Sequence, residues 1–364
     1  MFTKLQLNQL KSFFSYKRPH KSESERQWMN EFLFDSLDLM GCSYIEDDAG
    51  NIHVDRRGGA SKTLFIAHVD SVHREAGRQE TVIDKNYVLK LADSTKSNCL
   101  GADDAAGVLV LLTLIKSGVS GYYIFSRGEE CGGIGAKFLV DHFSDLLSTF
   151  NRAIAFDRRG TSSVITHQGW GRCCSDAFAD ALSDALSDEF LMYAPDDTGV
   201  YTDTAEFVDI IPECTNISVG YMNEHSTSET LDLNHLYHLI NRVAQIDWEA
   251  LPTERDPLDE QYVDKFGAVG LRDYGFTEFN SVVYDALIDA QSGDFDGLLW
   301  LIAEAVSPVD PDEVYAMLWS ATLPPDLIKR AIKQVDRATS DGETQEALFD
   351  LYDALYSYVP TQYH

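Results

Sequence analysis

The chain has 364 residues, of which 44% are hydrophobic, and a formal net charge of −30. This length exceeds the roughly 100–200 residues of a typical domain, so we expect two domains. The negative charge argues against nucleic acid and anionic membranes as partners. We find no apolar run of about 18 residues and no signal-peptide pattern, so we expect a soluble cytoplasmic protein. The six cysteines show no CxxC spacing, so we expect reduced thiols.

The N-terminal part is predicted to start with helices and to continue with a hairpin. Helices are expected over residues 5–14 and 22–40, the second opening at Ser22 or Ser24. The hairpin is expected over residues 44–55, around a turn at Gly50. A further pair of strands is expected around residues 81–83 and 87–91.

Three apolar runs of strand length lie between residues 64 and 156, and each is followed by His, Asp or Glu residues that could bind metal or transfer protons. The runs and the residues after them are 64–67 with His68 and Asp70, 122–125 with Glu129 and Glu130, and 153–156 with Asp157. A helix over residues 104–116 connects the first two runs, which is typical of a βαβ unit and predicts a parallel sheet. Buried parallel strands are continuous apolar runs, and ligands collect outside their carboxyl ends. We therefore expect these charged side chains at one edge of the sheet.

One imidazole and several carboxylates at one place are costly without a cation, which favours a divalent metal. Nitrogen and oxygen ligands suit zinc first, with manganese or cobalt as alternatives. His68 and Asp70 lie on one side of an extended chain, so Asp70 can orient a metal-bound imidazole. Asp103 and Asp104 begin a helix, whose dipole favours negative charge, and one of them could bridge two metals.

Glu129 and Glu130 are consecutive and point in different directions, so one can bind metal while the other handles protons. Taken singly, each group also has an ordinary structural explanation. An HxD pattern is usually a hydrogen-bonded histidine, an acidic pair is usually exposed, and Asp103 and Asp104 could be helix caps. The order of the groups and their matching local structure favour a dinuclear site.

Further elements complete the core. In chain order they are a helix over 136–147, a strand over 161–166, a helix over 175–187, a short strand over 190–193, a strand around 217–220 and a helix over 231–248. Glycines 132, 133 and 135 would let backbone pack closely beside the site. A nucleotide loop is not favoured there, because the two preceding acids would repel phosphate.

Residues 251–364 carry a net charge of −15, with 22 Asp and Glu against 7 Lys and Arg. They begin with a charged, Pro-containing linker, and helical periodicity recurs over 279–290, 298–305, 312–319, 327–335 and 344–358. We predict a catalytic domain over residues 1–250 and a small acidic all-helical domain over residues 251–364. Capping the active site, forming an oligomer and binding a partner remain alternatives for this second domain, beside a simple solvated acidic face.

Five motifs carry a resemblance to a known superfamily. In order they are HVD, GADDAAG, GEECGGIGA, AFDRRG and NEHSTSE. Together, over residues 23–249, they resemble the co-catalytic zinc exopeptidases, which include peptidase T, the bacterial leucyl aminopeptidases and the glutamate carboxypeptidases. The resemblance implies an α/β fold with a three-layer αβα core and a mostly parallel central sheet.

The resemblance also implies a set of metal ligands. His68 and Asp157 would hold one zinc ion, Glu130 and His225 would hold the other, and Asp103 would bridge them. Cobalt or manganese could replace zinc. The peptide bond after Asp103 would be cis.

The implied activity is that of a metal-dependent exopeptidase. Glu129 would be the general base for a hydroxide bound to the two metals, and Asp70 would steady His68. Asp rather than Glu at position 157 resembles the aminopeptidase members, which favours short peptides with a free amino terminus as substrates. A carboxypeptidase or N-acyl amino-acid deacylase is the alternative, and a non-catalytic binding or scaffold protein is the more distant one. Whether identical chains form an oligomer is left open.

Only 68 positions separate Asp157 from His225. The peptidase T branch places a separate lid domain in this interval, and here core elements use most of it. The chain therefore departs from that branch and resembles the aminopeptidases that have a single core.

Overall fold

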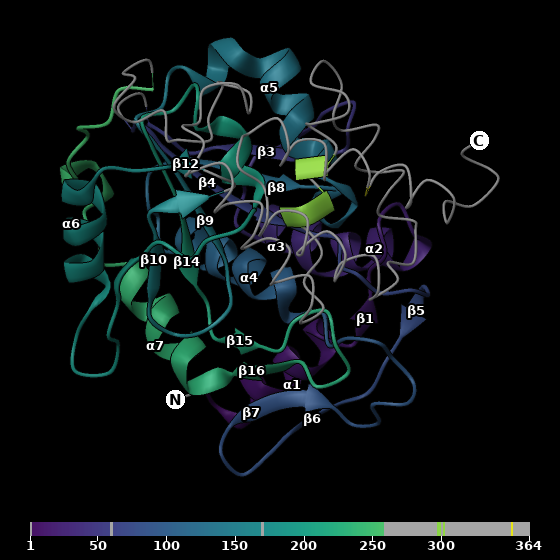
Figure 1. Ribbon diagram of the computed structural model, residues 1–364. Coiled ribbons are helices and arrows are strands. Elements are labelled where there is room, and N and C mark those ends of the chain that lie inside the picture. The colour runs from purple at the N-terminus through teal and green to yellow at the C-terminus, as the bar shows by residue number, and fades with distance from the viewer. Residues whose placement is uncertain are drawn as a thin grey trace. The chain divides into compact units, whose positions relative to one another are not determined.

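The computed structural model describes residues 2–58, 61–168 and 171–257, together with 297–299, 301–302 and 351. The chain divides into two units, Met1–Asp264 and Lys265–His364, and the labelled elements of Figure 1 belong to the first. The five helices expected after residue 279 lie almost wholly outside the described residues. The exceptions are residues 297–299, 301–302 and 351, which are helical. The predicted boundary after residue 250 stays a prediction.

A sheet with the strand order β13-β10-β14-β9-β4-β8-β3-β2 forms the centre of the first unit (Figure 1). Its four central strands are parallel: β14 (Glu213–Ser218), β9 (Arg152–Arg158), β4 (Thr63–His68) and β8 (Tyr122–Ser126). Every residue of β4, β8 and β14 is buried, which explains the nearly continuous apolar sequence of β4 and β8. The predicted α/β fold with a mostly parallel central sheet is confirmed.

Antiparallel pairs extend the sheet at both edges. β3 (Ile52–Asp55) pairs with β8 and with β2 (Ile45–Glu46), which is the predicted hairpin. At the other edge, β10 (Ser163–Ile165) pairs antiparallel with β14 and parallel with β13 (Ala194–Asp196).

The strand predicted over residues 190–193 is wrong. The Asp188 carboxylate accepts the backbone N–H groups of Phe190 and Leu191 at 2.7 and 3.0 Å, so this stretch turns instead of extending. The edge strand begins only at Ala194. A polar side chain that bonds its own backbone two and three residues further on has outweighed the strand propensity of the apolar residues.

Smaller sheets lie beside the main one. β15 (Tyr221–Met222), β16 (Thr230–Asp232), β7 (Val88–Leu91) and β6 (Thr81–Ile83) form an antiparallel sheet, in which β6 and β7 are the predicted pair. Two-stranded pairs are formed by β1 (Tyr16–Lys17) with β5 (Gly77–Arg78) and by β11 (His167–Gln168) with β12 (Gly171–Arg172).

The N-terminal helices follow the sequence prediction closely. α1 (Lys4–Phe13) opens with Thr3, whose side chain caps the helix. The helix expected over residues 22–40 is continuous through α2 (Glu23–Trp28), a π-helical stretch (Met29–Phe34) and α3 (Asp35–Leu39). Of the two candidate caps, Ser22 is the one that accepts the N–H of Glu25.

Helices cover both faces of the main sheet. α4 (Ala102–Lys116) packs on β4 and β9, and α7 (Leu233–Val243) packs on α4. On the opposite face, Phe143 of α5 (Ile134–Leu147) contacts His53 of β3. α6 (Asp176–Leu186) lies beside β10 and β13. None of the helices in the described part of the chain is long and apolar enough to cross a membrane.

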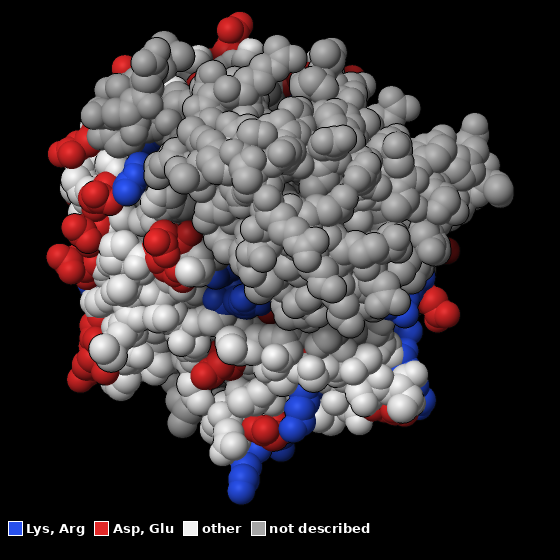
Figure 2. Space-filling view, viewed as in Figure 1, with Lys and Arg blue, Asp and Glu red and all other residues white. Residues whose placement is uncertain are grey.

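The helix expected over residues 231–248 is shorter than predicted. Its first residues belong to β16, and the side chain of Asp232 accepts the N–H groups of Asn234 and His235, which starts α7. Acidic side chains gather over α6 in Figure 2, where Asp176, Asp180 and Asp184 are exposed. Part of the large negative charge of the protein therefore lies on the solvent-exposed surface of this helix.

Candidate metal centre

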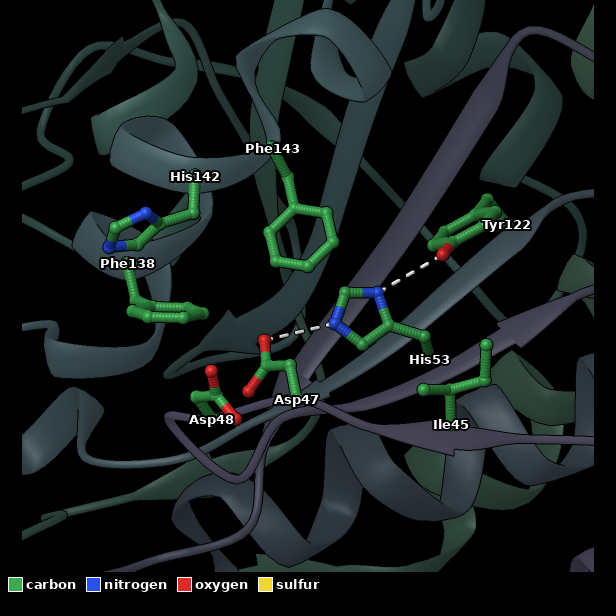
Figure 3. A pocket seen from close by; sticks show the side chains of 8 residues that line it. All are labelled: Ile45, Asp47, Asp48, His53, Tyr122, Phe138, His142 and Phe143. Atoms are coloured by element: carbon green, nitrogen blue, oxygen red, sulfur yellow. Dashed lines mark hydrogen bonds and ion pairs between the residues drawn. The ribbon is translucent and has the colours of Figure 1, made fainter.

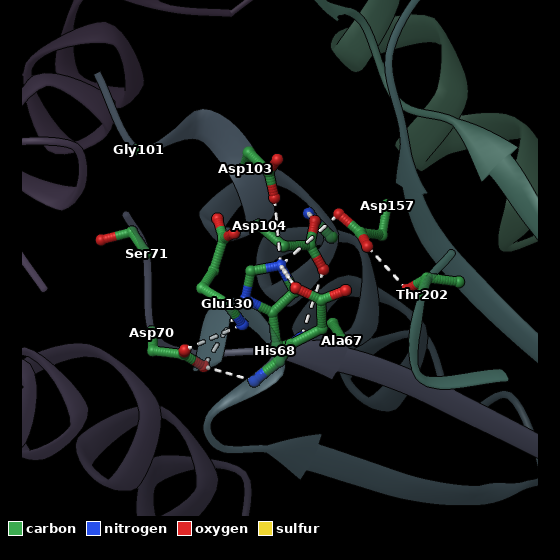
Figure 4. A network of polar contacts seen from close by, with 12 residues as sticks. Ala67, His68, Asp70, Ser71, Gly101, Asp103, Asp104, Glu130, Asp157 and Thr202 are labelled. Carbon is green, nitrogen blue, oxygen red and sulfur yellow. Dashed lines mark hydrogen bonds and ion pairs between the residues drawn. The ribbon is translucent and has the colours of Figure 1, made fainter. Parts of the chain in front are cut away.

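The seven residues singled out in the sequence come together at the carboxyl edge of the central strands, and Figure 4 shows most of them. His68 is the last residue of β4, and Asp157 is the penultimate residue of β9. Asp103 lies in the first turn of α4. The other four are Asp70, Glu129, Glu130 and His225. The short apolar strands deliver these side chains to one place because parallel strands end at the same edge.

Asp103 lies between the two imidazoles. Its Oδ1 is 3.0 Å from Nε2 of His68, and its Oδ2 is 3.1 Å from Nε2 of His225. Each imidazole also has a carboxylate of its own: Nε2 of His225 is 3.1 Å from Oε1 of Glu130, and Nε2 of His68 is 3.6 Å from Oδ1 of Asp157. Two histidine–carboxylate pairs therefore share one central carboxylate.

The peptide bond between Asp103 and Asp104 is cis, as the resemblance implies. The carboxylate of Asp104 is fully buried. Its Oδ1 accepts the N–H of Gly107 at 2.9 Å, and its Oδ2 accepts the backbone N–H of His68 at 3.3 Å. Of the two consecutive aspartates, Asp103 is thus the one placed to bridge, and Asp104 links α4 to β4.

The site contains more carboxylates than its imidazoles can neutralise. Burial, and then repulsion by Asp103, raises the pKa of Glu130 to about 7. The same two causes raise the pKa of Asp157. Burial opposes protonation of His225, but its hydrogen bonds to Asp103 and Glu130 outweigh this and raise its pKa to about 11. The electrostatic balance of the site therefore favours an added cation.

The donor atoms fit divalent metal ions. One group of ligand atoms within 4.8 Å of one another comes from Asp103, Glu130 and His225. A second group contains His68 and Asp157, and its third member, Asp104, already accepts two backbone N–H groups. Imidazole nitrogen with carboxylate oxygen is a zinc-type set, and it also suits cobalt or manganese.

Asp70 does more than the sequence predicted. Its Oδ1 lies 3.7 Å from Nδ1 of His68, which agrees with the expected orienting contact. The same carboxylate accepts backbone N–H groups from Gly128 at 2.7 Å and from Glu129 and Glu130 at 3.3 Å each. Asp70 therefore fixes the turn that carries both glutamates, in addition to facing His68.

Glu129 lies beside the candidate ligands. Its Oε2 is 3.8 Å from Nε2 of His68. Burial raises the pKa of Glu129 well above its usual range, and the repulsion of Glu130 and Asp157 adds to this. Glu129 is thus a buried carboxyl group of raised proton affinity beside the candidate ligands.

Sequence reasoning missed the residues that hold Asp157. Oγ1 of Thr202 donates to Oδ2 of Asp157 at 2.6 Å, and the hydroxyl of Tyr221 donates to its Oδ1 at 3.0 Å. Asn216 bonds the backbone of Asp157 through both its amide oxygen and its amide nitrogen. These contacts span 45 to 64 positions of sequence, and no local pattern indicates them.

Asp203 was also missed. It is 1% exposed, and the hydroxyl of Ser126 donates to its Oδ2. Its Oδ1 has no hydrogen-bond partner in the described part of the chain. Burial raises the pKa of Asp203 to about 7, and Asp70 and Asp157 add repulsion. The polar run TDT within a hydrophobic stretch is the only sequence signal that could have indicated it.

A separate pocket of about 470 Å³ lies near the opposite end of β8 (Figure 3). His53 lines this pocket, and its Nε2 lies 3.0 Å from Oδ2 of Asp47 and its Nδ1 3.0 Å from the hydroxyl of Tyr122. Asn51 occupies both carboxylate oxygens of Asp47 as well. His53 therefore has a structural role, and among the described residues the pocket brings together no second group of metal-type ligand atoms.

Comparisons with known proteins support the fold. No protein-family model matches the sequence, and no curated protein does. Among solved structures, aminopeptidase PepT from Bacillus cereus ATCC 10987 matches with a TM-score of 0.54 and 15% identity, over 65% of this chain and 96% of that chain. A TET aminopeptidase from Thaumarchaeota archaeon SCGC AB-539-E09 matches with a TM-score of 0.51 and 12% identity, over 67% and 97%. Aminopeptidase APDkam598 from Desulfurococcus kamchatkensis matches with a TM-score of 0.50 and 15% identity, over 73% and 98%. The chain has the fold of these proteins, which confirms the predicted structural resemblance.

Proposed function

We propose that this protein is a metal-dependent aminopeptidase that removes N-terminal residues from short peptides. The observation that carries the proposal is the shared carboxylate: both oxygens of Asp103 contact an imidazole, one from His68 and one from His225. Glu129 lies alongside this pair. The aminopeptidases with the same fold support the reaction class.

In this proposal the candidate ligands form two metal positions. His68 and Asp157 would hold one ion, Glu130 and His225 would hold the other, and Asp103 would belong to both. Two divalent ions supply a polarised substrate carbonyl and a water of lowered pKa.

Glu129 transfers the proton in this reaction. Its carboxylate removes the proton of the attacking water and delivers it to the leaving amine. Asp70 holds the backbone of Glu129, so the base keeps its position through both transfers. Thr202 and Tyr221 fix the two oxygens of Asp157 and prevent it from rotating away.

Exposure indicates the side from which the substrate enters. The side chain of His68 is 1% exposed and that of Asp103 is 10% exposed, whereas that of His225 is 51% exposed. The centre is therefore closed on the His68 side and open on the His225 side.

The surplus of carboxylates supports a free amino terminus as the recognised group. Besides the candidate ligands and the base, Asp70, Asp104 and Asp203 are buried at this edge. An ammonium group would be attracted there, whereas the carboxylate of an N-blocked substrate would be repelled. A carboxypeptidase or deacylase on the same site is the alternative.

A panel of short peptides, each with a free and with an acetylated amino terminus, tests the proposal after loading with Zn²⁺ or Co²⁺. Cleavage of the free-amine peptides alone is expected. Cleavage of the acetylated peptides would move the activity to carboxypeptidase or deacylase. Absence of any cleavage by protein that holds two metal ions would favour a non-catalytic binding protein.

A further inference from the structure

The buried side chain of Glu229 holds the turn that precedes Asp103. Its Oε2 accepts the N–H groups of Leu100 at 2.7 Å and Gly101 at 2.9 Å, and its Oε1 accepts those of Ala102 at 2.7 Å and Asp103 at 3.2 Å. Glu229 is 1% exposed. One carboxylate thus binds four consecutive backbone donors at the start of α4, where the helix dipole also favours its charge.

A buried arginine holds the same turn from its carbonyl side. Nη2 of Arg18 donates to the carbonyl of Gly101 at 2.9 Å, and Nε donates to the carbonyl of Val69 at 2.9 Å. Arg18 is 0% exposed, and its guanidinium lies 4.7 Å from the ring centroid of Trp28. The ring and the two carbonyls therefore fix the guanidinium plane.

These contacts join segments that carry three candidate ligands. Arg18 binds the carbonyl directly after His68 and the carbonyl two residues before Asp103. Glu229 lies four residues after His225 and binds the backbone up to Asp103 itself. The two side chains thus tie the segment of Asp103 to the segments of both imidazoles that Asp103 contacts.

The turn has no spare room. Gly101 has a φ of +71°, and a Cβ there would lie 2.7 Å from Cε1 of His73 and 3.4 Å from Nη1 of Arg18. A glycine is therefore required at this position. Arg18 and Glu229 hold this backbone through hydrogen bonds to the carbonyl and to the N–H group of Gly101.

We propose that Arg18 and Glu229 are positioning residues that place Asp103 between the two metal positions and thereby set the affinity of the centre for divalent cations. This proposal rests on the proposed function for the identity of the metal centre. Neither side chain contacts the reacting atoms. Loss of partners that orient metal ligands typically weakens metal binding by about 10–100-fold.

The test uses Glu229→Gln and Arg18→Met in the full chain, with Glu229→Asp and Arg18→Lys as conservative variants. A Gln side chain keeps one acceptor oxygen but turns an NH₂ group toward N–H donors. Matched controls come from buried groups at the other end of the strands. Glu213 is 0% exposed and accepts the N–H groups of Ser175, Glu254 and Arg255, and Arg152 is 2% exposed and donates to the carbonyl of Leu251.

Co²⁺ binding to the apoprotein is followed by titration calorimetry and by the visible spectrum of the bound ion, without peptide. We expect Glu229→Gln and Arg18→Met to bind Co²⁺ about 10–100-fold more weakly and with an altered spectrum, and the conservative variants to be intermediate. Glu213→Gln and Arg152→Met should lose thermal stability and keep the wild-type affinity. Should either severe variant not fold, its conservative partner decides the matter.

Wild-type Co²⁺ affinity and spectrum in the folded Arg18 and Glu229 variants would overturn the proposal and leave them a purely structural role. Because the readout needs no turnover, it is independent of the peptide assay. A wild-type protein that binds two Co²⁺ ions but cleaves no peptide would refute the proposed function, while weakened binding by the variants would still support the positioning role.

Discussion

The two ends of the central strands hold buried charge in opposite ways. At the amino end, both terminal nitrogens of Arg152 donate hydrogen bonds, to Glu249 at 3.2 Å and to the carbonyl of Leu251 at 3.0 Å among others. Both oxygens of Glu213 accept hydrogen bonds, including two from Ser175. The buried charges of Arg152 and Glu213 therefore meet an opposite charge or oriented dipoles, and Nε of Arg152 is the one polar atom of these two side chains without a partner in the described part of the chain.

At the carboxyl end, acids outnumber their partners. Among the described residues, the cationic groups that pair with Asp103, Glu130 and Asp157 are the imidazoles of His68 and His225. Burial raises the pKa of Glu130 to about 7, and it raises the pKa of Asp157 as well.

The two ends of the strands thus differ in how far their buried charges are compensated by partners. Buried ions are costly unless they are paired, so a fold that keeps more acids than cationic groups together gives up stability at that place. Perturbed acids in one cluster are typical of sites that bind or react. The amino ends of these strands thus hold compensated buried charges, whereas their carboxyl ends hold a cluster of acids with raised pKa values.

The largest expected effect comes from Glu129→Gln at the carboxyl end. Because the amide cannot accept the proton of the attacking water, kcat/KM should fall by about 10²–10⁴-fold. Metal affinity should stay close to that of the wild type. Steady-state kinetics together with Co²⁺ titration check both parts, and Glu213→Gln is the control that should keep its turnover. Normal turnover by Glu129→Gln would refute its role as the base.

Metal loading should stabilise the protein by relieving the repulsion at the carboxyl end. At a free Zn²⁺ or Co²⁺ concentration of about 100 times the dissociation constant, one site adds about 2.7 kcal/mol to the free energy of unfolding. Thermal melts with and without chelator measure this. A melting temperature that is independent of metal would mean that the acids at this edge do not form a metal centre.

Arg152→Met tests the amino end. The change leaves hydrogen-bond acceptors without their donor, and it should lower the free energy of unfolding by about 1–3 kcal/mol. The cost stays moderate because the side chain of Glu249 is 39% exposed and water can reach it. Urea denaturation measures the loss. Weakened Co²⁺ binding by Arg152→Met would contradict the view that the amino end contributes to stability and not to the metal centre.

The sequence predicts the carboxyl end well because its signals are local. An apolar strand that stops at His68 or Asp157 is visible within a few residues, and parallel strands must bring such ends together. The contacts that support these residues are not local. Thr202 reaches Asp157 across 45 positions and Arg18 reaches Gly101 across 83, and both residues look like ordinary polar residues in the sequence.

The errors have the same origin. Asp188 turns residues 190–193 away from the sheet through bonds of its own side chain, and the pairing of β16 with β7 takes the first residues of the helix predicted over 231–248. Apolar periodicity shows that a segment is buried. It does not show which side chain or strand takes its backbone hydrogen bonds.

His73 lies near the carboxyl end of the strands, but its buried side chain is satisfied by hydrogen bonds, as the charged groups at the amino end are. It is 3% exposed, and its Nε2 lies 3.1 Å from Oε1 of Gln79 and 3.1 Å from the carbonyl of Cys99. Burial, and then repulsion by Arg18, lowers the pKa of His73 to about 3. In the unfolded chain its pKa is about 6.5.

Between these two pKa values the unfolded chain binds a proton that the folded protein does not. The stability that His73 contributes is therefore fully present above about pH 6.5 and is lost progressively as the pH falls toward 3. From pH 7 to pH 5.5 the wild type should lose about 1 kcal/mol more than His73→Gln, which has no proton to gain. Urea denaturation of both proteins at the two pH values measures the difference. Equal losses would show that His73 titrates normally in the folded protein.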